Sequence, residues 1–298
     1  MVLFGPRWLV AIPLGILLSL AAALQSRHSL LPLIPAALIV FGPFMGLSLP
    51  LGKIRSPAYP VIRVLTCNLN AGHFNERALA SLIQESRVDI VALQECPREL
   101  RLGIPPGWRI LREGELAVLS RYPLRQTDSV QALHPPHQWP RSSLLCSVVE
   151  APGGDVAFCT VHLPSPRYGL QNVLDRATLL SLSRRGLLNE ETAHRRKTAQ
   201  EVKRAVDSLS LPIIVAGDFN MPVESAIYRE FWGGYANAFS RAGFGYGLTQ
   251  WVAVRGIKQG VRIDHVLTGS GLVPSLCETG PNVGSDHLPV IADICRWP

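Results

Sequence analysis

The sequence predicts an α/β fold in which two β-sheets pack face to face with helices outside, preceded by two apolar helices. Many short segments rich in β-branched and apolar residues, each bounded by Pro, Gly or charge, follow one another without an intervening helix. Two long apolar stretches near the N-terminus carry no charged residue. A chain of 298 residues can also bury a sizeable core. We find no internal repeat or low-complexity tract.

The two apolar stretches, residues 8–24 and 30–51, are separated only by Gln-Ser-Arg-His-Ser. About 20 apolar residues suffice to cross a bilayer, so the second stretch is long enough and the first is at the lower limit. Four prolines would kink the second helix, which membrane helices tolerate. We therefore predict a membrane anchor over residues 1–52, with helices at about 8–24 and 30–51, and a location in the cell membrane.

A secretory signal is the alternative for the first stretch. Arg7, the apolar segment and the three alanines at 21–23 fit the layout of a signal peptide. The second stretch would still attach the chain to a membrane. The side of the membrane stays open, because lysine and arginine flank the stretches without asymmetry. A further apolar helix encoded upstream would reverse that side.

The remaining chain divides into a connector over residues 53–60, rich in proline, and a compact domain over 61–298. Asn75 is expected to cap a helix. Residues 172–209 are expected to be mainly helical, with two helices meeting near Gly186. Strands are expected at 61–67, 89–93, 116–119, 144–149, 156–161, 213–216, 263–267 and 290–294.

The charge balance favours an anionic partner. Lysine and arginine number 29 against 22 acidic residues, which gives a net charge of +7 and a pI near 9.3. Residues 176–204 hold eight of the basic residues and only three glutamates. This stretch either recruits an anionic substrate or is a solvated helix surface.

The six cysteines show no CxxC spacing, so neither a zinc nor a redox motif is present. Cys67 and Cys159 fall within apolar strands, and we expect both to be buried thiols. Their number does not decide the redox compartment.

Polar residues follow several of the predicted strands. Asn68 ends the first, Glu95 follows the second, and Asp218 and Asn220 follow the apolar run before Gly217. A carboxylate at a strand end can hold Mg²⁺, which prefers oxygen ligands. Taken singly, each of these residues is more often a loop or turn residue; together they indicate one site for hydrolysis of a phosphate ester.

Histidines complete this candidate site. His287 can act as a general base if a carboxylate fixes its tautomer, and Asp264 is the candidate partner. His162 ends another predicted strand and could donate to a phosphate oxygen. His265 would point to the opposite face of its strand, so we expect a structural role for it.

These residues together resemble the endonuclease/exonuclease/phosphatase family, over residues 61 to about 295. The order Asn, Glu, His, Asp-x-Asn, Asp, Asp-His carries the resemblance. It implies a four-layer α/β/β/α sandwich and phosphoester hydrolysis that depends on Mg²⁺ or Mn²⁺. The apolar N-terminus makes the chain similar to a bacterial membrane-anchored branch of that family.

The resemblance also implies roles for individual residues. The metal would be bound by Glu95, Asn68 and Asp286; the catalytic group would be His287, Asp264, Asp218, Asn220 and His162; the substrate contacts would be Asn220, His162 and Arg121. Arg121 lies in a segment that recurs in the family, although a turn at a strand end explains it equally well.

Two departures bear on the substrate. Asn70 stands where an acid would add a second metal ligand, so metal binding rests chiefly on Glu95. His162 stands where abasic-site nucleases of the family tend to have Asn, which counts against an abasic-DNA enzyme.

We therefore expect a membrane-anchored, Mg²⁺-dependent phosphoester hydrolase with a histidine base. The expected partners are the membrane and an anionic phosphate ester, which could be a lipid-linked phosphate, a phospholipid headgroup or nucleic acid. A metal-dependent endonuclease or exonuclease is the alternative enzyme. A non-catalytic phosphate- or lipid-binding membrane module is the alternative of another class, and it predicts a missing catalytic residue.

Overall fold

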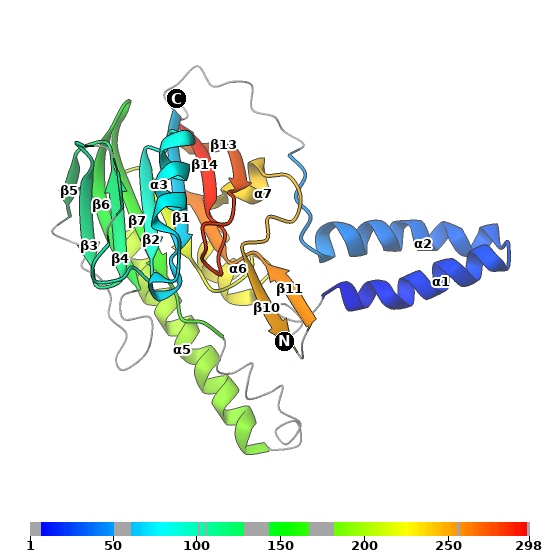
Figure 1. The fold of residues 1–298 in the computed structure, drawn as a ribbon. Helices are drawn as coiled ribbons and strands as arrows, with labels where there is room; N and C mark the ends of the chain where they lie inside the picture. The colour runs from blue at the N-terminus through cyan, green and yellow to red at the C-terminus, as the bar shows by residue number, and fades with distance from the viewer. Residues whose placement is uncertain are drawn as a thin grey trace.

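Two six-stranded sheets packed face to face form the body of the protein in a computed structural model (Figure 1). The structure describes residues 7–50, 61–100, 102–104, 106–127, 143–166, 182–254 and 257–296. The expected connector at 53–60 and the beginning of the basic stretch lie outside these described residues.

The first sheet has the strand order β13-β14-β1-β2-β4-β3. β1 is parallel to β2 and antiparallel to β14, with Asn68 opposite Gln94 at the end of the parallel pair. The strands are β1 (Val61–Asn68), β2 (Ile90–Gln94), β3 (Arg109–Glu113), β4 (Leu116–Ser120), β13 (Leu272–Thr279) and β14 (Val290–Arg296).

The second sheet has the order β5-β6-β7-β8-β12-β9. β7 is parallel to β8, with His162 opposite Asp218, and β12 is antiparallel to β8, with Asp264 opposite the same aspartate. The strands are β5 (Leu124–Gln126), β6 (Leu144–Ala151), β7 (Gly154–His162), β8 (Ile213–Asp218), β9 (Ala236–Asn237) and β12 (Asp264–Thr268). A separate hairpin pairs β10 (Gln250–Val254) with β11 (Ile257–Val261).

Helices cover the outer faces of both sheets. The apolar face of α3 (Glu76–Glu85), which Asn75 caps as expected, packs on the first sheet. The long α5 (Leu182–Asp207) and the short α6 (Ala226–Trp232) pack on the second. A further short helix, α7 (Ala238–Ala242), follows β9. The predicted four-layer α/β/β/α architecture is therefore confirmed.

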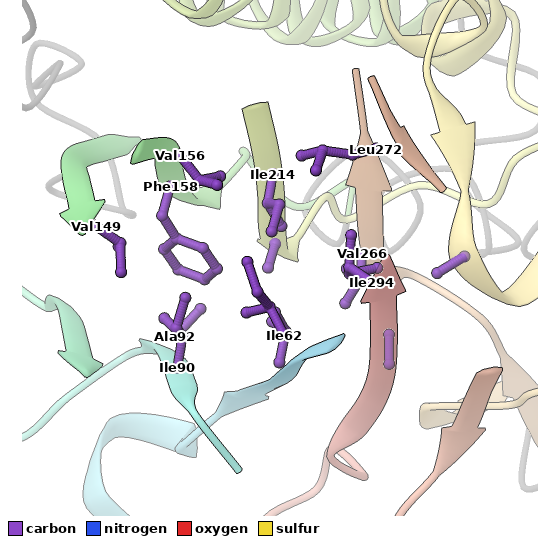
Figure 2. Close-up of a cluster of buried hydrophobic side chains, with 14 of the residues drawn as sticks. Ile62, Ile90, Ala92, Val149, Val156, Phe158, Ile214, Val266, Leu272 and Ile294 are labelled. Carbon is purple, nitrogen blue, oxygen red and sulfur yellow. The ribbon is translucent and has the colours of Figure 1, made fainter. Parts of the chain in front are cut away.

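The core between the sheets is apolar and closely interdigitated (Figure 2). Ile62, Ile90 and Ala92 from the first sheet meet Phe158 and Ile214 from the second, all at most 5% exposed. Burial of one such large side chain contributes about 1.5–3 kcal/mol. This layer therefore fixes how the two sheets sit on each other, and with it the position of every strand end.

The N-terminal segment forms two helices that lie side by side and project from the body (Figure 1). They are η1 (Arg7–Val10) continuing into α1 (Ala11–Ala23), and α2 (Arg27–Ile39) continuing into η2 (Val40–Phe44). The second helix therefore begins and ends earlier than the expected 30–51. Among the described residues, one helix, Arg27–Phe44, is long and apolar enough to cross a membrane, and none of that 18-residue stretch is buried. α1 is apolar but shorter.

Two local expectations were wrong. No helix boundary lies at Gly186, because α5 runs through it without interruption. Cys159 is not a free thiol: it forms a disulfide with Cys146, since the β6–β7 register places the two residues directly opposite each other. Cys67 is a buried free thiol, as expected.

Gly217 is required by strand packing rather than by a turn. It lies inside β8 with φ +153°, and a Cβ there would be 2.0 Å from the carbonyl oxygen of Val161 on β7. Only glycine lets the two backbones approach this closely. The close approach sets the neighbouring Asp218 beside the end of β7.

His265 is structural, on the outer face of β12. Its Nε2 donates to the carbonyl oxygen of Met221 at 3.0 Å, and the Asn237 amide lies 3.2 Å from Nδ1. The ring packs against Phe219 and Tyr228. Burial lowers the pKa of His265 from 6.5 to about 4, so the folded protein holds a neutral imidazole.

Because of this histidine, the free energy of unfolding should decrease as the pH falls. Because its pKa is lower in the folded than in the unfolded chain, protonation favours the unfolded chain below pH 6.5. When the pH is lowered from 7.5 to 5, the unfolding free energy of the unsubstituted protein should decrease by about 2 kcal/mol more than that of His265→Gln. Denaturant titrations at both pH values measure this, with exposed His73→Gln as the control. Equal losses in all three proteins would contradict it.

Candidate functional site

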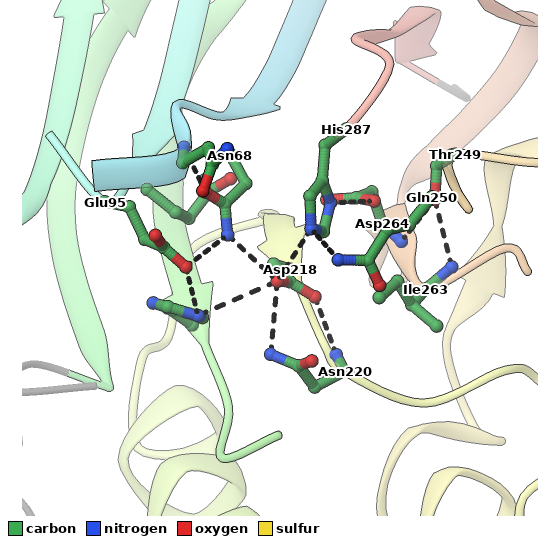
Figure 3. Close-up of polar contacts among 12 residues, drawn as sticks. Asn68, Glu95, Asp218, Asn220, Thr249, Gln250, Ile263, Asp264 and His287 are labelled. Carbon is green, nitrogen blue, oxygen red and sulfur yellow. Dashed lines mark hydrogen bonds and ion pairs between the residues drawn. The ribbon is translucent and has the colours of Figure 1, made fainter. Parts of the chain in front are cut away.

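The ends of five strands and one loop bring the predicted polar residues to one edge of the sandwich (Figure 3). Asn68 and Glu95 come from the ends of β1 and β2, His162 and Asp218 from the ends of β7 and β8, and Asp264 from the start of β12. His287 comes from the loop before β14. Parallel strands end at one edge and antiparallel neighbours begin there, so one edge collects all six side chains.

Asn68 connects the two sheets. Its Nδ2 donates to Oε1 of Glu95 at 3.0 Å and to Oδ2 of Asp218 at 3.1 Å, while its Oδ1 accepts from the backbone N–H of Asn70. One amide thus holds a carboxylate from each sheet within hydrogen-bond distance. Two carboxylates so close to one point make a site that attracts a cation.

The loop after β8 is organised around Asp218. Its carboxylate accepts from the backbone N–H of Asn220 at 2.8 Å and from Asn220 Nδ2 at 3.1 Å. Asn220 Nδ2 also donates to the carbonyl oxygen of Leu163 at 2.8 Å. Asn220 therefore fixes the orientation of Asp218 and has both amide hydrogens engaged.

The Asp264–His287 pair is buried and short. Nδ1 of His287 donates to Oδ2 of Asp264 at 2.8 Å. A carboxylate only accepts, so this bond directs Nε2 of His287 toward the site, 3.9 Å from Oδ2 of Asp218. The hydroxyl of Thr249 accepts from the N–H groups of Ile263 and Asp264, which anchors the start of β12.

Ser285 couples the histidine loop to β1. Its hydroxyl donates to the carbonyl oxygen of Asn68 at 2.7 Å and accepts from the N–H of His287. These two bonds hold His287, the proposed base, in a fixed position relative to Asn68, the proposed metal ligand.

His162 lies between the acids of the two sheets. Its Nε2 is 3.7 Å from Oε1 of Glu95 and 3.7 Å from Oδ2 of Asp218, and its Nδ1 is 3.6 Å from Oε1 of Glu115. Burial lowers the pKa of His162, but Glu115, Asp218 and Glu95 raise it above its usual value on balance. This histidine is suited to carry a proton and to donate to an anion.

The acids and His287 shift each other's protonation. Burial, and next the charge of Asp264, raises the pKa of Asp218 to about 6. For His287, burial opposes the charged form, but Asp264 and then Asp218 outweigh it and raise the pKa to about 10. Strongly shifted groups that converge in one place are typical of functional sites.

Backbone strain is concentrated at the same edge. Glu95 has φ +53° and Asn220 has φ +50°, a left-handed conformation that residues with a Cβ seldom adopt. Asn70 and Ala71, just after Asn68, are also left-handed. Such strain of about 1–3 kcal/mol per residue persists where the surroundings impose it, frequently at active sites.

Two site residues were missed by sequence reasoning. Gln250 on β10 places its side-chain amide 2.7 Å from Nε2 of His287. Arg195 on α5 is buried and donates to the carbonyl oxygens of Pro164 and Asn220, so it supports the Asp218 loop. Burial lowers the pKa of Arg195 to about 10. The only sequence signal for Arg195 was its position in a helix with many basic residues. Gln250 had no such signal.

Arg121 does not reach this site. It follows Ser120, which pairs with Ile90 at the start of β2, whereas Glu95 follows the other end of that strand. Its guanidinium forms an ion pair with Asp89 at 3.1 Å and lies over the ring of Tyr122. The predicted substrate contact is therefore corrected: Arg121 belongs to a turn at the opposite end of the sheet.

Asp286 is beside the site but points outward. It is exposed, whereas Ser285 and His287 on either side are buried. The charge of Asp286 also raises the pKa of His287, but less than Asp264 and Asp218 do. The structure places it at the rim of the site, so a metal-ligand role for Asp286 stays a prediction.

Oxygen donors make the site suitable for a hard divalent cation. Glu95, Asp218 and Asp264 supply three carboxylates, and Oδ1 of Asp264 has no hydrogen-bond partner among the described residues. Ligand atoms of Asp218, Asp264 and His287 all lie within 4.8 Å of one another. A cation could also bind beside Glu95 and Asn68. At that position it would leave the Asp264–His287 hydrogen bond intact.

Comparison with known proteins agrees with this geometry. The model of the Endonuclease/Exonuclease/phosphatase family matches residues 65–287. No curated protein sequence matches the chain significantly.

Solved structures share the fold. A family protein from Bacteroides thetaiotaomicron is 16% identical, with 81% of this chain and 100% of that chain covered and a TM-score of 0.58. Humanized TDP2 of D. rerio is 17% identical, with 78% and 98% covered and a TM-score of 0.56. D. rerio TDP2 complexed with single-strand DNA product is 15% identical, with 78% and 98% covered and a TM-score of 0.55.

The family match covers most of the chain, including every residue from Asn68 to His287 that meets at the sheet edge. The chain belongs to the Endonuclease/Exonuclease/phosphatase family, and it is accordingly a metal-dependent enzyme that hydrolyses phosphoester bonds.

Proposed function

We propose that the protein is a membrane-anchored, Mg²⁺-dependent phosphoester hydrolase with His287 as its general base. The buried Asp264–His287 hydrogen bond of 2.8 Å, facing Asp218 across the site, is the observation that carries this proposal. It fixes Nδ1 as the donor to Asp264 and turns Nε2 toward the site. A cation bound beside Glu95 would offset the negative charge that raises the pKa of His287, and Nε2 could then take a proton from water. The non-catalytic module predicted a missing site residue, and all of them are present.

The residues divide the chemistry among them. His287 removes the proton of the attacking water, and Asp264 stabilises the imidazolium that forms. Asp218, held by Asn220, orients that water. His162 donates to a phosphoryl oxygen, because its Nε2 points between the carboxylates of Glu95 and Asp218. These groups act on charge and position, which dominate phosphoryl transfer.

Glu95, with Asn68 beside it, would hold the metal. When bound, Mg²⁺ or Mn²⁺ neutralises charge that develops on the phosphate oxygens. The carboxylate of Glu95 is only partly buried, so that an ion with several retained water molecules can reach it.

Membrane anchoring is proposed on the helix Arg27–Phe44, which is long and apolar enough to cross a bilayer and has no buried residue. α1 would either accompany it as a second helix or act as a signal sequence. The proposed location is the cell membrane.

A nuclease is the second candidate function. The structural likeness to D. rerio TDP2, solved with single-strand DNA product, favours it. The basic residues of α5 are weaker support for nucleic-acid binding, because Arg196 forms an ion pair with Glu230 at 2.6 Å and Lys203 forms one with Asp207. Phosphate contacts by free basic residues make nuclease binding strongly dependent on salt. Plasmid cleavage at low salt that EDTA abolishes would favour the nuclease.

Replacement of the base should abolish turnover without unfolding the protein. His287→Ala and Asp264→Asn should each lower kcat about 10²–10⁴-fold on the best substrate of a phosphate-ester panel with Mg²⁺, and the double variant should lose little more. The full chain in detergent is assayed at saturating substrate. Full turnover by His287→Ala would refute the proposed mechanism.

Removal of one carboxylate charge should weaken metal binding. Glu95→Gln keeps the size of the side chain but loses its charge, so the affinity for Mn²⁺ should fall about 10–100-fold. Electron paramagnetic resonance titration of free Mn²⁺ measures this directly. Glu85→Gln, at an exposed glutamate of α3, is the matched control. Unchanged Mn²⁺ affinity in Glu95→Gln would indicate instead that the metal binds at Asp218, Asp264 and His287.

A further inference from the structure

An exposed aromatic loop, residues 243–251, lies between the N-terminal helices and the candidate site. Phe244 is 76% exposed although glycines flank it on both sides, and Trp251 at the other end of the loop is 45% exposed. Single exposed apolar side chains are ordinary, but a contiguous apolar surface marks an interaction site. Figure 1 shows the two N-terminal helices projecting from the side that carries α7, β10 and β11.

Hydrogen bonds tie this aromatic loop to the end of the second N-terminal helix. Ser48 and Gly245 exchange backbone hydrogen bonds of 2.8 and 3.0 Å. The hydroxyl of Tyr246 donates to the carbonyl oxygen of Phe41 at 2.9 Å. Phe41 lies in the last turn of the apolar helix Arg27–Phe44, so the aromatic loop is level with the end of that helix.

The base of the aromatic loop is held firmly. Arg262 donates to the carbonyl oxygen of Tyr246 at 3.2 Å, and its guanidinium lies 4.7 Å above the ring of Phe239. The hydroxyl of Ser48 donates to the carbonyl oxygen of Phe239 at 3.0 Å. The loop backbone at Gly245 and Tyr246 is therefore held in position relative to the helix end by contacts on both sides.

The same loop reaches the proposed base. Thr249 anchors the start of β12, and Gln250 contacts Nε2 of His287. Successive residues of a strand point to opposite faces, so Gln250 is buried toward the site while Trp251 is exposed. Only one peptide bond separates an exposed ring from a residue of the catalytic site.

The dimensions fit a bilayer. The 18 residues of Arg27–Phe44, which kink at Gly42, span at most about 27 Å, close to the ~30 Å thickness of a hydrocarbon core. The end of such a helix lies at the interface, where Trp and Tyr rings are enriched because they have an apolar body and a polar tip. Tyr246 and the neighbouring Phe244 would lie at that depth.

We propose that the aromatic loop is a membrane-docking surface whose occupant is the bilayer interface, and that it holds the catalytic site at the lipid surface. This inference rests on the proposed membrane-anchored hydrolase. It specifies the substrate class: phosphate esters with one part embedded in the same bilayer. Soluble phosphate esters would reach the site without help from the aromatic loop.

Lipid quenching tests the docking without any need for activity. The full chain is reconstituted in phosphatidylcholine vesicles with lipids brominated near the headgroup. The added tryptophan of Phe244→Trp, measured as the difference from the unsubstituted protein, should lose at least about half its emission. Ile110→Trp is the matched control, because Ile110 is 56% exposed on β3 at the far edge of the first sheet. Equal quenching at both positions would overturn the docking surface.

Substrate partition tests the consequence. Phe244→Ser should lower turnover of hexadecyl p-nitrophenyl phosphate in vesicles by about five- to ten-fold, which corresponds to one ring lost from the interface. Turnover of soluble bis(p-nitrophenyl) phosphate should not change, and Ile110→Ser should affect neither substrate. Equal effects of Phe244→Ser on both substrates would overturn the inferred substrate class.

The two hypotheses fail separately. Strong quenching of Phe244→Trp together with no metal-dependent turnover of any phosphate ester would reject the proposed function and retain the docking surface. Metal-dependent turnover together with equal quenching at Phe244→Trp and Ile110→Trp would do the reverse.

Discussion

The whole site depends on the packing of one sheet against the other. The apolar layer around Phe158 and Ile214 fixes the separation and rotation of the sheets, and the parallel pairs β1–β2 and β7–β8 then end at the same edge. Near that edge the layer becomes polar, where Gln94 of the first sheet donates to Thr160 of the second at 2.9 Å. Beyond it, the amide of Asn68 joins the acids of both sheets. A shift of either sheet would separate these groups by more than a hydrogen bond allows.

The site collects negative charge that the fold itself does not neutralise. Carboxylates of Glu95, Glu115, Asp218 and Asp264 surround His162 and His287. Their charges raise the pKa of both histidines against the effect of burial. The pKa of Asp218 is raised first by burial and next by the charge of Asp264. A divalent cation beside Glu95 would compensate the same charge, which explains why one arrangement can bind metal, hold a protonated histidine and orient water. Left-handed backbone at Glu95 and Asn220 shows that the surroundings impose this arrangement against local preference.

Sequence reasoning recovered the site where chemistry follows directly from a strand end. Asn68, Glu95, His162, Asp218 and Asp264 all lie at ends of strands that apolar periodicity marks. Arg121 was misplaced because the sequence pattern does not state at which end of a sheet a strand terminates; the antiparallel pairing of β4 with β2 decides it. Gln250 was missed because a glutamine in a hairpin has no distinguishing pattern. The requirement for glycine at position 217 comes from the backbone of β7, which no local pattern marks.

The sequence by itself therefore determined the class of fold, the family and the type of reaction, because strand periodicity and the ordered set of acids, amides and histidines are local properties of the chain. Tertiary structure alone decided the partners of each group: which histidine is buried neutral and which faces the acids, which cysteines pair, and how the aromatic loop lies against the end of the apolar helix. These depend on register and on contacts between residues far apart in the chain, such as Ser48 with Gly245. No local pattern encodes such distances, since they arise only when the two sheets close on each other.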